Sequence, residues 1–143
     1  MTPDRLALLL KLANQREAEA LQALADAQAE TARREAVRLE LFSYLQGSEA
    51  AAPRVESSAL LLNQQAFCQR LRQALSAQTQ QVELAGRAVQ SARDRWLLAR
   101  QQQRTQARLQ QQAAEVERKQ MERRAQIDCD ELAAQRWLAA SLP

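Results

Sequence analysis

The chain holds few residues that could carry out catalysis or bind a metal ion. It has no histidine and two cysteines, Cys68 and Cys129, which excludes histidine general bases and histidine metal ligands. The densest titratable cluster is Asp128-Cys129-Asp130-Glu131. Four consecutive residues of a helix point in different directions around its axis, which favours solvated acids over a metal site. The chain also lacks a Gly-rich loop and a nucleophile beside a base, so we predict no enzyme, no cofactor and no metal.

The cysteines and the apolar runs indicate the cellular compartment of the protein. On one continuous helix, the two cysteines would lie about 90 Å apart at roughly 1.5 Å per residue, too far for a disulfide. The longest runs of large apolar residues are Leu8 to Leu10 and Leu60 to Leu62, too short to span a membrane. The amino terminus does not resemble a secretory signal. We therefore expect reduced thiols in a cytoplasmic protein without direct membrane insertion.

The overall composition is that of long helices. The chain has 29 alanines, 22 leucines and 22 glutamines among 143 residues, against two glycines. Only ten residues are β-branched, too few for a sheet of any size. Because alanine supplies much of the apolar content, little remains for a thick core, and the predicted fold class is all-α, thin and extended.

One loop divides two predicted helices. Thr2 is a good N-cap and Pro3 suits the first helical position, while Gly47 is a natural C-terminal stop. We expect helix one at about 3–46, a loop at about 47–57 and helix two at about 58–139. Helices joined by a short loop become antiparallel neighbours. The prediction for residues 1–143 is therefore a single antiparallel coiled-coil hairpin in which the second helix is much longer.

The apolar periodicity predicts how these helices pair. A 3.6-residue step from Phe67 passes mainly through apolar and small residues to Trp96, whereas a strict 3.5-residue step from Leu6 reaches Arg34 and Arg38. We therefore predict long, gently wound helices rather than a tight zipper. With the loop centred near residue 52, residue 6 should face residue 98. Everything after about residue 100 is then expected to lack a partner in its own chain.

That carboxyl-terminal overhang is polar and unevenly charged. It begins with the run RQQQRTQARLQQQ, and residues 87–124 hold ten basic and four acidic side chains. A solvated face, a match to an acidic protein surface and a phosphate-binding helix are the open interpretations. Interruptions by Asp94, Glu115, Glu117 and Glu122 argue against nucleic acid.

Several segments resemble the FliJ family of the flagellar type III export apparatus. The first helix closes with the run Leu39-Glu40-Leu41-Phe42-Ser43-Tyr44-Leu45. After the loop come Phe67 and Leu71, an aromatic and a leucine four residues apart. Trp96 stands in the middle of the second helix, and Asp130-Glu131-Leu132-Ala133 follows a Gln/Arg-rich turn near its end. The resemblance covers nearly the whole chain. It departs from the family in lacking further aromatics before Phe67 and in having arginines for terminal lysines.

The resemblance implies a function that composition alone does not. Family members resemble the central stalk of rotary ATPases, with both chain ends inside a hexameric export ATPase ring. The expected role is a non-enzymatic stalk that promotes ring assembly and links the ring to the membrane export gate, an FlhA-like protein. The protein would be cytoplasmic, peripherally associated with the inner-membrane export apparatus, and could escort export chaperones. The implied ring contacts are Arg108, Arg118, Arg123, Asp128, Asp130, Glu131 and Leu132.

Phe67 and Leu71 have two interpretations. The pattern alone favours coiled-coil core beside Leu39 and Phe42, whereas the resemblance implies contact with the export gate.

Other functions remain open at this stage. An injectisome stalk of the YscO type resembles the chain almost as well, and a general helical export chaperone is a further alternative. A basic nucleic-acid-binding helix is the third.

Overall fold

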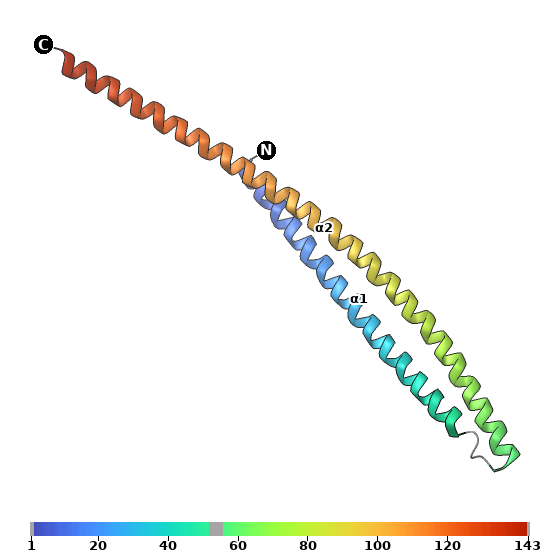
Figure 1. The fold of residues 1–143 in the computed structure, drawn as a ribbon. Coiled ribbons are helices and arrows are strands. Elements are labelled where there is room, and N and C mark those ends of the chain that lie inside the picture. Colours follow the sequence, from blue (N-terminus) through green and yellow to red (C-terminus); the bar gives the residue numbers. More distant parts are fainter. Residues whose placement is uncertain (1, 52–55, 143) are drawn as a thin grey trace. The chain divides into compact units, whose positions relative to one another are not determined.

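Two long helices make up nearly all of the described chain. In the computed structural model, which describes residues 2–51 and 56–142, α1 spans Pro3–Ala51 and α2 spans Ser58–Ser141 (Figure 1). They contain 49 and 84 residues, and the described residues include no strand. The predicted all-α hairpin with a much longer second helix is therefore confirmed.

Each helix begins at a side-chain cap. The Arg5 amide donates a hydrogen bond to Thr2 Oγ1 at 3.4 Å, and Pro3 occupies the first helical position as predicted. The Leu60 amide donates to Ser57 Oγ at 3.1 Å. These hydroxyls satisfy amides that have no carbonyl partner in the first turn of a helix.

The first helix does not stop at Gly47. Helix α1 continues to Ala51, and Gly47 does not have the positive φ of a glycine stop. Alanines at positions 50 and 51 favour continued helix, and contacts from α2 support this last turn: Gln64 Nε2 donates to the Ser48 carbonyl at 2.7 Å. Of the predicted loop 47–57, residues 52–55 lie outside the described residues.

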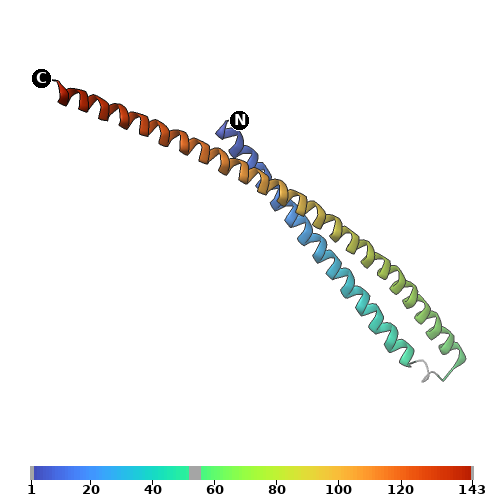
Figure 2. The same ribbon diagram turned by 45° about the horizontal axis from the view of Figure 1, so that its top comes forward.

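The chain divides into two compact units. The hairpin unit is Arg16–Ala99, and the terminal unit combines Met1–Gln15 with Arg100–Pro143. Within the hairpin unit, two views show α1 and α2 running side by side in opposite directions (Figures 1 and 2).

Polar bonds between the helices fix the register of the hairpin unit. Trp96 Nε1 donates to Glu17 Oε1 at 2.9 Å, and Gln78 Nε2 donates to the Arg34 carbonyl at 3.1 Å. Residue 17 therefore faces residue 96, whereas the predicted register placed residue 87 opposite it. The difference is about two and a half helical turns. The prediction erred because it centred the loop near residue 52, although α1 itself extends to residue 51.

The inner faces of the hairpin unit follow a seven-residue repeat. Less exposed residues alternate three and four apart along both helices, which is the coiled-coil spacing and implies left-handed winding. The prediction of a straighter 3.6-residue period was wrong for this unit. On α1 this seam contains Glu17, Ala20, Leu24, Ala27, Thr31, Arg34, Arg38, Leu41, Leu45 and Ser48. On α2 it contains Gln64, Cys68, Leu71, Leu75, Gln78, Val82, Ala85, Val89, Ala92, Trp96 and Ala99.

Arginines occupy the seam because their charged ends have partners at its edge. Arg34 Nε lies 2.8 Å from Glu30 Oε1, and its NH1 donates to Gln81 Oε1 at 2.9 Å. Arg38 Nε donates to Glu35 Oε2 at 3.0 Å. The aliphatic stems can cover apolar surface while the guanidinium groups stay at the edge. Excluding arginine from a seam was the assumption that misled the period analysis.

No described helix is long and apolar enough to cross a membrane.

Candidate partner-binding surfaces

The terminal unit has a covered part and an uncovered part. On α2, Gln103, Gln106, Gln110 and Ala113 are half-buried, and on α1 Leu6 is only 7 % exposed. From residue 114 to residue 142 every residue is exposed. We call residues 114–142 the tail segment. The predicted start of the overhang, about residue 100, was too early, because α1 pairs further along α2 than the assumed register allowed.

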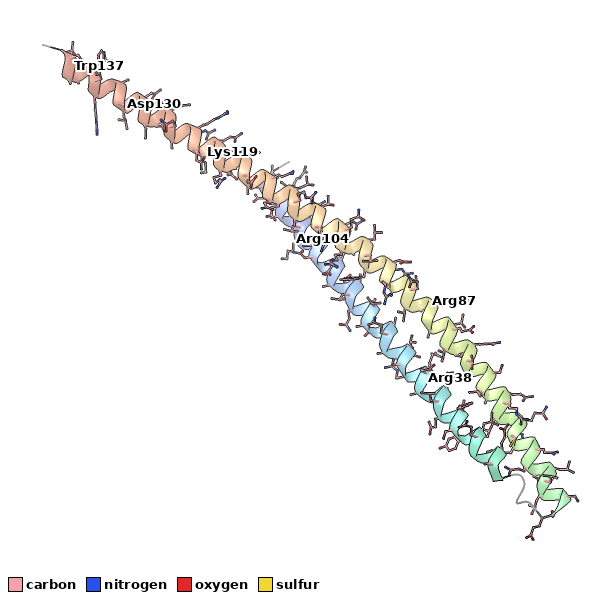
Figure 3. All side chains as sticks on the ribbon, in the orientation of Figure 1. Arg38, Arg87, Arg104, Lys119, Asp130 and Trp137 are labelled. Carbon is pink, nitrogen blue, oxygen red and sulfur yellow. The ribbon has the colours of Figure 1, made fainter. Side chains whose placement is uncertain are left out.

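The tail segment carries most of the predicted ring-contact residues. Arg118, Arg123, Asp128, Asp130, Glu131 and Leu132 all lie in it and are exposed. Arg108 is also exposed but lies before the tail segment, on the part of α2 that α1 covers. Figure 3 labels Lys119, Asp130 and Trp137 along this stretch of α2. Most of the predicted set thus lies on one helical segment that this chain leaves uncovered.

The predicted ring-contact set did not include several exposed apolar residues of the tail segment. Trp137 is 69 % exposed and Met121 is 64 % exposed. Val116, Ile127 and Leu138 are each more than half exposed. Moving a large apolar side chain out of water is favourable, and burying one fully contributes about 1.5–3 kcal/mol of free energy. Their occurrence along a segment predicted to have no partner in its own chain could have identified them as contact residues from the sequence.

Phe67 and Leu71 lie four residues apart, on nearly the same side of α2, but they differ in burial. Phe67 is 49 % exposed, whereas Leu71 is half-buried in the seam. The buried position next to Phe67 is held by Cys68, which is 5 % exposed. The predicted stripe from Phe67 to Trp96 therefore follows the seam from Gln78 onward but misplaces its start by one residue, at Phe67 instead of Cys68. Phe67 is therefore the more exposed side chain of this pair, and Leu71 belongs to the seam.

Other exposed apolar side chains lie near the turn. Helices α1 and α2 both contribute to this set, which we call the turn-end residues. They are Leu39, Phe42, Tyr44, Leu60, Leu61, Leu62 and Phe67. Single exposed leucines are common on protein surfaces, but here seven exposed apolar side chains occur towards one end of the hairpin unit. Such a group is a candidate for contact with another protein.

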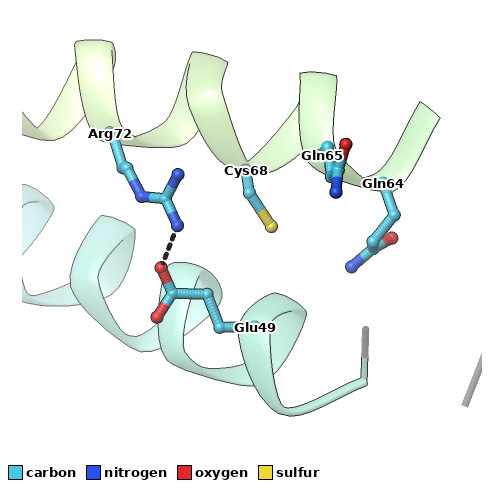
Figure 4. Close-up of a pocket in the computed structure, with 5 residues that line it drawn as sticks. All are labelled: Glu49, Gln64, Gln65, Cys68 and Arg72. Carbon is cyan, nitrogen blue, oxygen red and sulfur yellow. Dashed lines mark hydrogen bonds and ion pairs between the residues drawn. The ribbon is translucent and has the colours of Figure 1, made fainter. Parts of the chain in front are cut away.

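A small hollow near the turn has a structural role. Arg72 NH2 lies 2.6 Å from Glu49 Oε1, and this ion pair joins the last turn of α1 to α2 beside Cys68 (Figure 4). Gln64 and Gln65 complete the lining. Both cysteines are free thiols, Cys68 buried and Cys129 exposed. No group of three or more potential metal ligands occurs among the described residues.

Two carboxylates of the hairpin unit have lowered pKa values. Hydrogen bonds from Arg33 and Arg34 hold the pKa of Glu30 below its ordinary value of 4.5, and a hydrogen bond from Arg38 lowers that of Glu35. These carboxylates and their arginine partners all lie within α1, and only Arg33 among them is exposed. They stabilise the helix and edge of the seam rather than forming a reactive site.

The geometry defines a class of protein: an antiparallel two-helix coiled coil with an uncovered helical tail and apolar side chains exposed at its turn. Comparison with protein families matches residues 2–141 to the family described as the Flagellar FliJ protein. The chain belongs to the FliJ family, a non-catalytic flagellar protein family, and is a component related to flagellar export. No curated protein and no solved structure was found to match it.

Proposed function

We propose that this protein is a stalk of the flagellar export machinery that performs no chemistry itself. Its tail segment enters a hexameric export ATPase ring and promotes assembly of that ring. Its turn end links the ring to an FlhA-like membrane export gate. The proposal rests on membership of the FliJ family, and the observation that carries it is the uncovered tail segment, residues 114–142.

The tail segment needs a partner for physical reasons. A helix without tertiary contacts is marginal in water, because its stability rests on propensity and on side-chain pairs worth a few tenths of a kcal/mol. The ion pair between Arg118 and Glu122 in this stretch spans 3.9 Å, and both side chains are 68 % exposed. The exposed side chains of Trp137 and Ile127 would stabilise this helix only if a partner buried them. The interior of a ring would supply that burial.

Charge on the tail segment can orient it within a ring. Arg118 and Arg123 lie before Ile127, and Asp128, Asp130 and Glu131 lie after it. A ring with acidic groups at one level and basic groups at another would therefore bind it at one depth. Electrostatic matching of this kind adds specificity and speeds association more than it adds affinity.

The turn end has the features of a second contact surface. Phe67 is half exposed on the hairpin unit, and six further turn-end residues are exposed near the turn. An aromatic side chain buried at an interface is a frequent anchor of binding. We propose that Phe67 contacts the export gate directly, and that Leu71 acts mainly by holding the seam in place.

Truncation after Glu117 tests the ring contact. It removes nearly all of the tail segment but leaves the paired part of the terminal unit, including Ala113, and the whole hairpin unit. We expect the truncated protein to lose stimulation of the cognate export ATPase and of its ring assembly. Its far-UV circular dichroism should fall only by the helix removed. Undiminished stimulation would refute the tail as the ring contact.

Single substitutions separate the two positions of the gate contact. Phe67→Ala should weaken binding to the gate's cytoplasmic part while leaving thermal unfolding nearly unchanged. Leu71→Ala should lower the free energy of unfolding by about 2 kcal/mol, since it removes half-buried seam. Trp137→Ala, an exposed aromatic on the tail segment rather than at the turn end, is the matched control for loss of an aromatic side chain. Unaltered gate binding by Phe67→Ala would remove this residue from the interface.

The proposed location and the remaining partners follow from this role. A stalk that joins an ATPase ring to a gate works in the cytoplasm, peripherally associated with the inner-membrane export apparatus, without inserting into the membrane. It could also escort export chaperones through its exposed helical faces. The match to a flagellar family favours flagellar use over an injectisome stalk of the YscO type. Deleting the gene should therefore impair motility first.

A further inference from the structure

One face of the tail segment has apolar residues placed symmetrically around Ile127. Val116 lies eleven residues before it and Leu138 eleven residues after it. Eleven residues make about three helical turns, so these three side chains share one face. Each is more than half exposed. The eleven-residue spacing gives a straighter stripe than the seven-residue seam of the hairpin unit.

Charges beside this face are opposite in sign on the two sides of Ile127. Arg123 and Arg124 precede Ile127 by four and three residues, and Asp130 and Glu131 follow it by three and four. In an antiparallel pair of identical helices centred on Ile127, Arg124 of one copy lies beside Glu131 of the other. Arg123 likewise lies beside Asp130. A two-fold axis repeats both pairings, which gives four opposite-charge contacts.

A surface hollow lies where the end of such a partner would arrive. It adjoins Val116 and is lined by Pro3, Leu6, Ala113, Val116, Glu117 and Gln120. In the antiparallel arrangement, Leu138 of one copy comes opposite Val116 of the other. The hollow can therefore receive that leucine beside Leu6. By symmetry each copy supplies one hollow and one leucine.

We propose that the tail segments of two copies of this chain pair antiparallel about a two-fold axis through Ile127. The pairing buries the Val116, Ile127 and Leu138 stripe that a single copy leaves exposed. Only three large apolar layers contribute, so the dimer is weak and reversible. It uses the same helix that the proposed stalk role inserts into a ring. Self-association therefore competes with ring binding and holds the free protein in a reserve form.

Cysteine cross-linking tests the orientation of the pair in the full-length chain. Val116→Cys and Leu138→Cys are made separately with Cys129→Ser, which removes the exposed native thiol. Under mild oxidation, a mixture of the two should form disulfide-linked heterodimers in preference to either homodimer. Disulfides between two Val116→Cys chains would indicate parallel pairing and overturn the proposal. Equal random cross-linking, or none while both proteins remain helical, would also overturn it.

Charge reversal tests the contacts without cysteine chemistry. Glu131→Arg places like charges opposite Arg124 twice, and we expect the dissociation constant measured by sedimentation to rise about tenfold. Adding Arg124→Glu to the same chain should restore dimerisation. Glu122→Arg makes the same charge change on the opposite face and should leave it unaltered. A sedimentation profile of monomer alone at all concentrations up to the millimolar range would refute the dimer.

The same variants distinguish this proposal from the stalk role. If self-association fails but the truncation after Glu117 still abolishes ATPase stimulation, only the dimer is refuted. If the dimer forms and the truncation leaves stimulation intact, the stalk role fails and the dimer stands. Where both hold, added ATPase should convert the cross-linkable dimer to monomer.

Discussion

The hydrogen bond between Trp96 and Glu17 is the clearest residue-scale link between the two helices. Both side chains are half-buried, and the indole nitrogen lies 2.9 Å from the carboxylate oxygen. A hydrogen bond to a charged group is among the stronger ones. It also favours one register, since the adjacent seam positions Ala20, Ala92 and Ala99 cannot form it. This bond therefore specifies register more than it supplies stability.

Removing that carboxylate should be measurable. Glu17→Ala is expected to lower the free energy of unfolding by about 1–2 kcal/mol, because the indole donor loses its recorded partner. Urea denaturation followed by circular dichroism measures the change. Glu83→Ala, at an exposed position off the seam, is the matched control and should stay within about 0.5 kcal/mol. Equal effects of the two substitutions would show that the bond does not contribute.

The lowered pKa values of Glu30 and Glu35 predict a pH dependence. A carboxylate with a lower pKa in the folded state stabilises the fold above its unfolded pKa, and this contribution is lost as the pH falls through the folded value. Stability should therefore fall below about pH 4.5, the ordinary value. The double variant Glu30→Gln, Glu35→Gln should show a shallower fall in melting temperature. Identical slopes for both proteins would contradict this assignment.

At the scale of the helices, α1 passes through Gly47 and α2 through Gly86. A Cβ built at either glycine meets nothing within 4 Å, and neither has a positive φ. Each glycine therefore only weakens its helix. Alanine loses less backbone entropy on folding than glycine, so each substitution should stabilise the fold by about 0.5–1 kcal/mol.

Gly47→Ala and Gly86→Ala should each raise the melting temperature by a few degrees. Gly86→Ala is the reference, because its position lies in the middle of the long helix. Thermal unfolding followed at 222 nm measures both. A loss of stability for Gly47→Ala alone would mean that the chain turns at Gly47, as the sequence first suggested.

The two helices could be predicted from the sequence, whereas the way they pair could not. Composition and caps such as Thr2 specify the elements, because they are local properties. Register and period depend on which side chains tolerate the seam. Arg34 and Arg38 occupy the seam because their guanidinium groups bond to partners at its edge. A count of apolar periodicity does not include such bonds. The period error moved Phe67 onto the seam, and the misplaced loop centre started the overhang too early.

The candidate surfaces were partly predictable for the same reason. Tail residues such as Asp130 and Leu132 belong to a segment beyond the reach of the shorter helix, and relative helix length can be read from the sequence. The exposure of Phe67 follows from Cys68 holding the seam position that the predicted stripe gave to Phe67, and only the structure shows this. The eleven-residue stripe around Ile127 was present in the sequence, but it acquires meaning only once residues 114–142 are seen to be exposed.

At the scale of the whole molecule, the central claim is that the tail segment becomes covered inside an ATPase ring. Its backbone amides are held only by an uncovered helix, whereas those of the hairpin unit are held within a paired coiled coil. Local opening is most frequent where few apolar contacts oppose it. Amide exchange should therefore be fastest in the tail segment of the free protein.

Hydrogen–deuterium exchange of the full-length protein, alone and with excess export ATPase under ring-forming conditions, tests this claim most directly. The free protein is measured at a concentration low enough to keep it monomeric. We predict that the ATPase slows exchange of residues 114–142 at least about tenfold and leaves residues 16–99 nearly unchanged. Protection of the hairpin unit with an unchanged tail segment would contradict the account.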